Sequence, residues 1–170
     1  MRQADQVTLT DDTVGDPGVT REWLYRRIVE DSPDAIIFAD REGVIRLWNK
    51  GAVVMFGYTE KEAVGQTLDL IIPERLRERH WRGYRGAMST GVTRYGRELL
   101  AVPATRKDGS KISIEFTISL LTDDAGQLIG AAAIIRDVTA RWRETKAFKE
   151  RLATAERQSS QRPGVFLCEH

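Results

Sequence analysis

Histidine is scarce in this chain, whose 170 residues include only His80 and His170. His170 is the last residue, whereas His80 lies in a segment whose periodicity predicts a long helix from about Leu76 to Ser89. One face of that helix, at positions i, i+4, i+7 and i+8, carries His80, Tyr84, Ala87 and Met88. We therefore expect the imidazole to point inward, where a neutral ring can bind a metal ion or bond to a nearby carbonyl.

Arginines surround His80 on the same segment, at Arg75, Arg77, Arg79, Arg82 and Arg85. Such a run can be a solvated face, can bind acidic groups of a ligand, or, together with Trp81 and Tyr84, can contact nucleic acid. Glu74 and Glu78 interrupt it, and the chain has 26 Lys and Arg against 25 Asp and Glu, a net charge of +1. We therefore expect no binding to nucleic acid or to an acidic membrane.

The elements that must position His80 occupy the middle of the chain. Residues 1–19 predict a flexible arm, and residues 20–139 predict a single domain whose N-terminal helix is capped by Thr20. An exit helix is expected at 140–158 and a loose tail at 159–170. The N-terminus has neither the apolar run of a signal peptide nor that of a membrane span, so we expect a cytoplasmic protein. The only cysteine, Cys168, lies in the tail, which excludes an internal disulfide and a zinc site built on several thiolates.

Five short segments predict strands. Ala35–Asp40 and Val44–Asn49 form a hairpin around Gly43, and three more strands are expected at 98–104, 111–120 and 128–139. The strand at 111–120 alternates apolar and polar residues, which is typical of a sheet with one buried face. Short helical pieces between Lys50 and Pro73 complete an α/β chain of the α+β type, a five-stranded antiparallel sheet with helices over one face and a helix flanking it at each end.

Several local sequences resemble the PAS domain family. They are SPDAIIFAD at the first strand, VIRLWNKGAVVMFGYTEKEAVGQTLDLIIP through the short helices, RKDGSKISIEFTIS across a hairpin, and IIRDVTARWRE at the exit. The resemblance covers about Trp23 to Arg143. It implies the PAS fold and a sensory role, but it leaves the ligand open because PAS domains bind haem, flavin, small metabolites or nothing.

The segment IIPERLRERH is similar to that of haem-binding, oxygen-sensing PAS domains, in which the inward histidine is the proximal iron ligand. This resemblance implies that His80 binds the iron of haem b and that Arg79 and Arg85 lie near its propionates. It also implies a pocket lined by Tyr84, Met88, Leu100, Ile114, Phe116 and the small residues Ala131, Ala132 and Ala133, next to Gly130. The sensed quantity would then be a diatomic gas or a redox state.

One position departs from the oxygen-sensor pattern. Counted back from the Lys107-Asp108-Gly109 turn, Leu100 occupies the place of the distal arginine, and Glu98 lies near that of the methionine ligand. Arg97 fits the arginine position only if the strand shifts by three residues. An apolar distal side favours carbon monoxide, nitric oxide or redox sensing, because bound oxygen gains most from a hydrogen-bond donor.

Flavin and cofactor-free alternatives stay open. A light-driven flavin adduct is excluded because residues 1–167 contain no cysteine, but FAD could bind non-covalently near Trp48, Asn49 and Trp81, although packing and capping explain these residues better. A cofactor-free PAS module would act in dimerisation or partner binding. We expect no catalysis, because the chain has no Ser-His-Asp or Cys-His set, no phosphate-binding glycine loop and no HExxH.

The exit segment predicts a signalling helix. Its apolar stripe is made of Trp142, Thr145, Phe148, Leu152 and Ala155 at spacings of three and four, which suits a short coiled coil or packing on a domain. Asp137-Val138-Thr139 would couple the last strand to this helix. We expect a homodimer through the N- and C-terminal helices, or contact with an output domain or signalling partner.

Overall fold

The computed structural model describes residue 14 and residues 19–93 and 99–160, with side chains to 154. Glu98, Arg97, Cys168 and nearly all of the arm and tail expected at 1–19 and 159–170 lie outside these residues. Residues 159 and 160, predicted to belong to the tail, belong instead to the last helix.

The described chain contains a five-stranded, wholly antiparallel sheet in the order β2-β1-β5-β4-β3. The strands are β1 (Ala35–Asp40), β2 (Ile45–Trp48), β3 (Leu100–Thr105), β4 (Lys111–Thr122) and β5 (Leu128–Asp137). Val44, predicted within the second strand, instead makes an isolated bridge to Thr67. This sheet confirms the fold class expected from the sequence.

One face of the sheet carries the hydrophobic core. Alternate residues of β1, β4 and β5 point into it, as the strand period requires, and they include Ile37, Ile112, Ile114 and Ile135. The opposite face holds polar residues of β4 and the half-exposed Ile134.

Short helices cover the buried face. They are α2 (Lys50–Phe56), α3 (Glu60–Ala63) and the 3-10 turn η1 (Leu68–Leu70). Asn49 caps α2 and Gly57 ends it in the left-handed conformation, while Thr59 and Glu62 form the capping box of α3. Phe56 and Ala52 of α2 are fully buried against the strands, and Trp48 packs on Phe56 at 5.4 Å between ring centroids.

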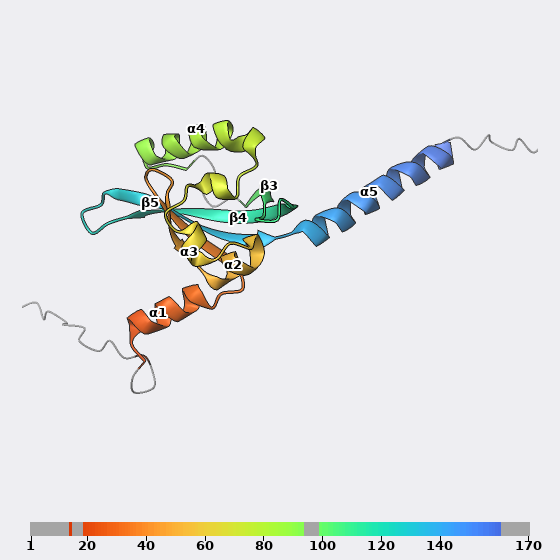
Figure 1. Ribbon diagram of the computed structural model, residues 1–170. Helices are drawn as coiled ribbons and strands as arrows, with labels where there is room; N and C mark the ends of the chain where they lie inside the picture. Colours follow the sequence, from red (N-terminus) through yellow and green to blue (C-terminus); the bar gives the residue numbers. More distant parts are fainter. Residues whose placement is uncertain (1–13, 15–18, 94–98, 161–170) are drawn as a thin grey trace, which may run out of the picture.

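Two helices flank this domain, and Figure 1 shows both projecting from it. Helix α1 (Arg21–Glu30) begins at Thr20, whose hydroxyl accepts a hydrogen bond from the Trp23 amide, and it has no buried residue. Helix α5 (Thr139–Ser160) starts and ends within two residues of the predicted exit helix. Between η1 and β3 lies α4 (Glu74–Thr90), which contains His80 and extends the predicted helix by two residues at its start and one at its end.

Candidate functional site around His80

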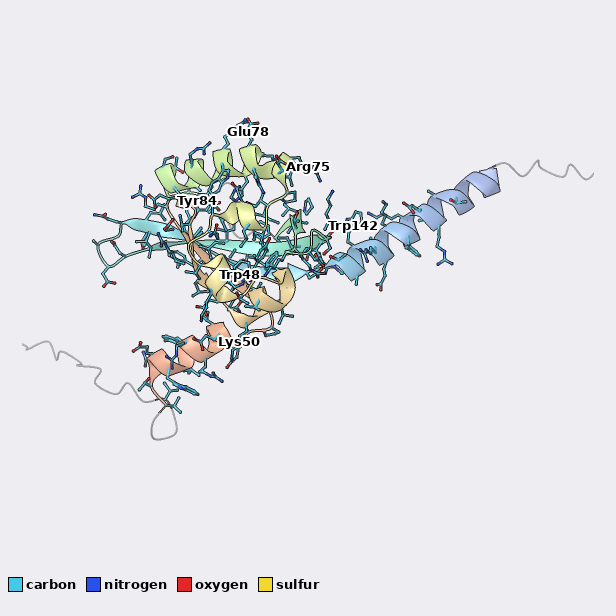
Figure 2. All side chains as sticks on the ribbon, in the orientation of Figure 1. Trp48, Lys50, Arg75, Glu78, Tyr84 and Trp142 are labelled. Carbon is cyan, nitrogen blue, oxygen red and sulfur yellow. The ribbon has the colours of Figure 1, made fainter. Side chains whose placement is uncertain are left out.

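Helix α4 presents two different faces. Figure 2 shows Arg75 and Glu78 on the side turned to solvent and Tyr84 on the side turned to the sheet. The helix ends at Gly91, which adopts the left-handed conformation that terminates a helix. The helix is 17 residues long, and its side that carries Tyr84 faces the domain.

His80 lies on the inward face, as its spacing predicted. Its side chain is partly buried, and its Nδ1 atom is buried with no hydrogen-bond partner. Burial lowers the pKa of the imidazole, while the charge of Asp69 acts in the opposite direction. A neutral ring with a buried, unpartnered nitrogen is chemically suited to bind a metal or to receive a proton from a ligand.

Two aromatic rings accompany His80. The His80 ring lies 5.0 Å from that of Trp81, edge to face, and 5.7 Å from that of Tyr84. Trp81 and Tyr84 in turn lie 5.7 Å apart with their planes at 76°. We call His80, Trp81 and Tyr84 the ring cluster.

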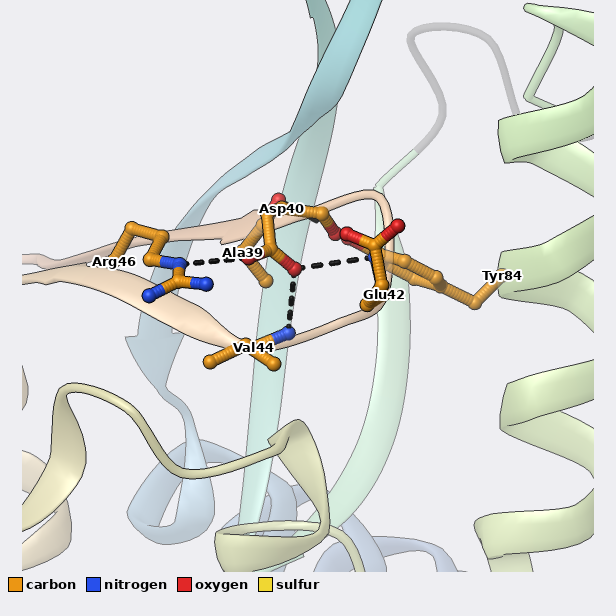
Figure 3. Close-up of polar contacts among 6 residues, drawn as sticks. All are labelled: Ala39, Asp40, Glu42, Val44, Arg46 and Tyr84. Atoms are coloured by element: carbon orange, nitrogen blue, oxygen red, sulfur yellow. Dashed lines mark hydrogen bonds and ion pairs between the residues drawn. The ribbon is translucent and has the colours of Figure 1, made fainter.

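Tyr84 connects the ring cluster to the sheet. Its hydroxyl lies 2.6 Å from the carbonyl oxygen of Asp40 and 3.1 Å from that of Ala39, at the end of β1 (Figure 3). Burial and the nearby carboxylates of Asp40 and Glu42 raise the pKa of the phenol well above its ordinary value, so it stays a donor. Tyr84 thus faces the sheet, as its helical spacing predicted. Its hydroxyl group is already hydrogen-bonded to backbone carbonyl oxygens.

The turn below Tyr84 has a polar network of its own. Asp40 accepts hydrogen bonds from the amides of Glu42 and Val44 and forms an ion pair with Arg46 at 2.6 Å (Figure 3). The carbonyls that Tyr84 contacts are therefore held in a turn with several independent bonds.

Trp81 connects the ring cluster to two further segments. Its indole Nε1 donates a hydrogen bond to the Asp69 carboxylate at 2.8 Å, and its six-membered ring lies directly over Gly43. A Cβ added to Gly43 would lie 2.3 Å from that ring, and Gly43 also has φ +80°, so a side chain there is excluded twice. Sequence reasoning missed Asp69, and its only signal is that it lies in the short turn before α4.

All but one of the strand residues predicted to line the pocket lie on the sheet face that bears the core. The exception is Ala132, which pairs with Phe38 and Ser119 and lies on the opposite face because successive residues of a strand alternate between faces. Register pairs Leu100 with Phe116, Ile118 with Ala133, and Leu120 with Ala131. Ile114 is buried, and Phe116 and Ala133 pack against the core as partly buried residues. Ala131 also pairs with Ala39, whose carbonyl oxygen Tyr84 contacts, so Ala131 lies beside the ring cluster.

Gly130 has a different role from the one expected. It was predicted to leave room next to a ligand, but a Cβ on Gly130 would lie 2.1 Å from the carbonyl oxygen of Ala39. The space is therefore filled by the neighbouring strand. The glycine permits close strand packing.

Three other residues of α4 were predicted to contact a haem, and only one of them is buried. Met88 is buried, whereas Arg79 and Arg85 are exposed and make no ion pair within the described residues. Arg77 is the arginine that lies close to the ring cluster, and it donates to the carbonyl oxygens of Asp69 and Ile72. The structure thus places the predicted propionate arginines on the flanks of the helix.

The residues considered for FAD have structural roles. Trp48 is buried in the core and donates to the carbonyl oxygen of Tyr58. Asn49 caps α2 and bonds the amide of Ile36, and its side-chain amide donates to the carbonyls of Val29 and Asp34. These bonds match the packing and capping roles that the sequence favoured.

A second feature lies at the joint between sheet and exit helix. Arg106 donates to the carbonyl oxygen of Met55 and forms an ion pair with Asp137 at 2.6 Å, and Thr139 accepts a hydrogen bond from the amide of Ser113. A surface hollow of about 410 Å³ lies here, away from His80, and it is lined by Pro33, Asp34, Gly51, Val54, Met55, Arg106, Arg136 and Asp137. The start of α5 is thus bonded to several elements of the domain.

The described residues contain neither a membrane-spanning helix nor a metal-binding cluster of side chains. Within them, no helix has the length and apolar content needed to cross a membrane. In the same part of the chain, no group of three or more His, Cys, Asp or Glu side chains is arranged to hold a metal ion. A haem iron, which needs a single protein ligand, is a different case.

Relatives of known sequence agree with this architecture. An uncharacterized protein of Azorhizobium caulinodans is 32% identical over 158 residues, which cover 91% of this chain and 21% of that protein. The sensor protein FixL of Bradyrhizobium diazoefficiens is 34% identical over 102 residues, or 58% of this chain and 20% of FixL. The signal transduction histidine-protein kinase AtoS of Escherichia coli is 30% identical over 131 residues, or 76% of this chain and 20% of AtoS. The chain thus spans about a fifth of the length of these curated relatives.

Solved structures give the same fold. The PAS domain of a Colwellia psychrerythraea protein is 26% identical with a TM-score of 0.61, over 69% of this chain and 96% of that one. An RNA-binding light-oxygen-voltage receptor has a TM-score of 0.63 at 21% identity, over 83% of this chain and 41% of that one, which supports the fold alone. The profile of the PAS fold matches residues 29–143. The chain therefore belongs to the PAS family of sensory modules, a family also present in the sensor kinases to which it is similar.

Proposed function

We propose that this PAS domain binds haem b through His80 and signals a gas or redox change through α5. The observation that carries the proposal is the buried Nδ1 atom of His80, which has no protein partner. A buried polar atom without a partner is costly, and a ligand that supplies the missing interaction removes that cost. The similarity of IIPERLRERH to haem PAS domains adds a second, independent support.

The neighbouring residues fit a flat, mostly apolar group. Burial favours the neutral imidazole that an iron ligand must be, and Ala131 of β5 offers a small side chain beside the ring cluster. Met88 and Ile114 are buried and apolar. When bound, haem would supply an iron centre able to take a diatomic ligand or to change oxidation state.

The protein's own residues would carry the signal from this site. Tyr84 bonds the end of β1, and β1 pairs with β5 along its whole length. The last residue of β5, Asp137, bonds Arg106 and the amide of Thr139 at the start of α5. A shift of α4 would therefore reach the exit helix through the two paired strands β1 and β5, and the same helix would act on an output domain or partner.

An absorption spectrum of protein purified after haem supplementation tests the proposal. We expect an intense Soret band in the wild type and its loss in His80→Ala prepared the same way. Glu78→Ala is the matched control, since Glu78 lies two residues from His80 on the same helix but its side chain is exposed. A colourless wild type, or a His80→Ala variant with an unchanged spectrum, would contradict haem binding through His80.

A second candidate is a cofactor-free dimerisation module, and exposed apolar side chains on both flanking helices favour it. On α1 these are Trp23, Tyr25 and Ile28, and on α5 they are Trp142, Phe148 and Leu152, all between 42% and 67% exposed. Single exposed apolar residues are ordinary, but three large ones on each flanking helix favour burial against a partner. A second copy of the chain would cover them symmetrically.

Light scattering of the protein without haem tests this candidate. We expect a dimer that the double variant Phe148→Glu, Leu152→Glu converts to a monomer, while the surface change Val54→Glu leaves the mass unchanged. A wild type that is monomeric at high micromolar concentration would contradict dimerisation through these helices.

A further inference from the structure

Helix α4 is fixed against the domain at two points within the turn that follows His80. Trp81 follows His80 directly, and Tyr84 lies one turn further along. Both side chains end in a hydrogen bond to another segment, Trp81 to Asp69 and Tyr84 to the end of β1. Two such anchors on one face determine the rotation of a helix about its axis, and with it the direction of the side chains between and beside them.

Asp69 holds this helix more than once. Its carboxylate accepts the indole hydrogen bond of Trp81 at 2.8 Å and pairs with the Arg77 Nε at 3.6 Å. Its backbone carbonyl accepts a further bond from Arg77 at 3.1 Å. Arg77 precedes His80 by three residues and Trp81 follows it by one, so Asp69 bonds both flanks of His80.

Gly43 determines how deeply Trp81 sits. The indole occupies the space that any Cβ at Gly43 would need, at 2.3 Å and 2.4 Å from two ring atoms. The ring is therefore confined between the Asp69 carboxylate at its nitrogen and the β1–β2 turn at its far edge. A tryptophan fixed at both ends leaves little freedom to the helix that bears it.

We infer that Asp69 is a positioning residue, which acts through Trp81 to direct the His80 imidazole toward the proposed haem. The inference rests on the proposed function for the identity of the ligand, but the placement of the ring by Asp69 is a separate property. Residues that orient a metal-binding histidine typically change metal affinity by about 10- to 100-fold when removed. Asp69 makes no hydrogen bond to His80 within the described chain, so apart from the action of its charge on the imidazole it acts on His80 through Trp81 or Arg77.

Haem titration of the full chain tests the inference with four variants. Asp69→Ala and Trp81→Phe both remove the indole hydrogen bond, and we expect each to weaken haem binding about tenfold or more. Asp69→Asn keeps an acceptor for the indole and should stay within about threefold of the wild type. Glu78→Ala, which removes an exposed carboxylate of the same helix, is the matched control.

Nuclear Overhauser contacts in the haem-free protein give a readout that does not depend on haem. We expect contacts between the His80 and Tyr84 rings in the wild type and in Asp69→Asn, and their loss in Asp69→Ala and Trp81→Phe. Unchanged ring contacts and unchanged haem affinity in the latter two would overturn the inference. A wild type that binds no haem would overturn the proposed function, and the ring contacts would then decide on their own whether Asp69 positions His80.

Discussion

Helices α2 and α4 both lie against the sheet, but they are held in different ways. Helix α2 buries Ala52 and Phe56 completely among aliphatic strand residues, in the main core. Helix α4 is attached by hydrogen bonds from Trp81 and Tyr84, with only Met88 buried along its whole length. Because apolar burial is non-directional and hydrogen bonds are directional, α2 supplies stability and α4 supplies orientation. Stability and orientation thus depend on separate helices in this domain.

The largest expected effect comes from breaking the α2 side of this contrast. Phe56→Ala should lower the free energy of unfolding by about 3 to 5 kcal/mol, because it empties a fully buried site next to Trp48. Urea denaturation followed by circular dichroism measures the loss. Val54→Ala, on the exposed side of the same helix, is the control, and equal losses for the two would contradict the assignment of the core to α2.

Asn49→Ala should have the next largest effect, a loss of about 1 to 3 kcal/mol. The variant removes the cap of α2 and leaves the carbonyls of Val29 and Asp34 without their donor, so it disturbs α1 and α2 together. Urea denaturation gives the energy, and hydrogen exchange should show faster exchange at the Ala52 amide. Lys50→Ala, which removes one exposed ion pair with Asp31, should cost much less.

Tyr84→Phe tests the α4 side and should cost about 1 kcal/mol. The ring remains, so only the bonds to the carbonyls of Ala39 and Asp40 are lost. We expect a small change in the urea midpoint but clearly faster hydrogen exchange in α4. If the midpoint falls as far as in Phe56→Ala, the two helices do not differ as described. Tyr25→Phe on the exposed face of α1 is the control.

The smallest effect concerns α3 and depends on pH. The hydrogen bond from Lys107, helped by those from Thr59, lowers the pKa of Glu62 from its ordinary value of 4.5 to about 2. A carboxylate with a lowered pKa stabilises the fold above its unfolded pKa, and this contribution is lost as pH falls from about 4.5 toward 2. Glu62→Gln should thus lower the urea midpoint slightly at pH 7, and the difference from wild type should shrink in that acidic range. A difference independent of pH would contradict the assignment, and Glu60→Gln is the control.

Much of the fold could be predicted because local patterns determined it. The alternation along 111–120 predicted β4, and the segment between Lys50 and Pro73 was predicted to hold short helical pieces, where the structure has α2, α3 and η1. Helical spacing also put His80 and Tyr84 on one face, where the structure places them 5.7 Å apart. Each of these features depends on residues close together in the chain.

The features that could not be predicted depend on distant contacts. The bond between Asp69 and Trp81 requires knowing how the turn before α4 folds back, and the contact of Trp81 with Gly43 joins residues far apart in sequence. Arg79 and Arg85, which the resemblance implied to lie near haem propionates, are exposed on the sides of α4, because neighbouring residues of a helix point in different directions. Arg77, which belongs to the inward side, could be found only from the packing of α4 against η1.

The pairing of Ala35 with Ile135 places the first residue of the sheet beside one of its last. The chain therefore enters and leaves the domain at the same end, where Asp34 and Arg136 form an ion pair across the two segments. A domain with this geometry can be inserted between two helices of a longer protein without separating them widely. The strand pairing of β1 with β5 and the ion pair of Asp34 with Arg136 thus tie the segment that follows α1 to the segment that precedes α5.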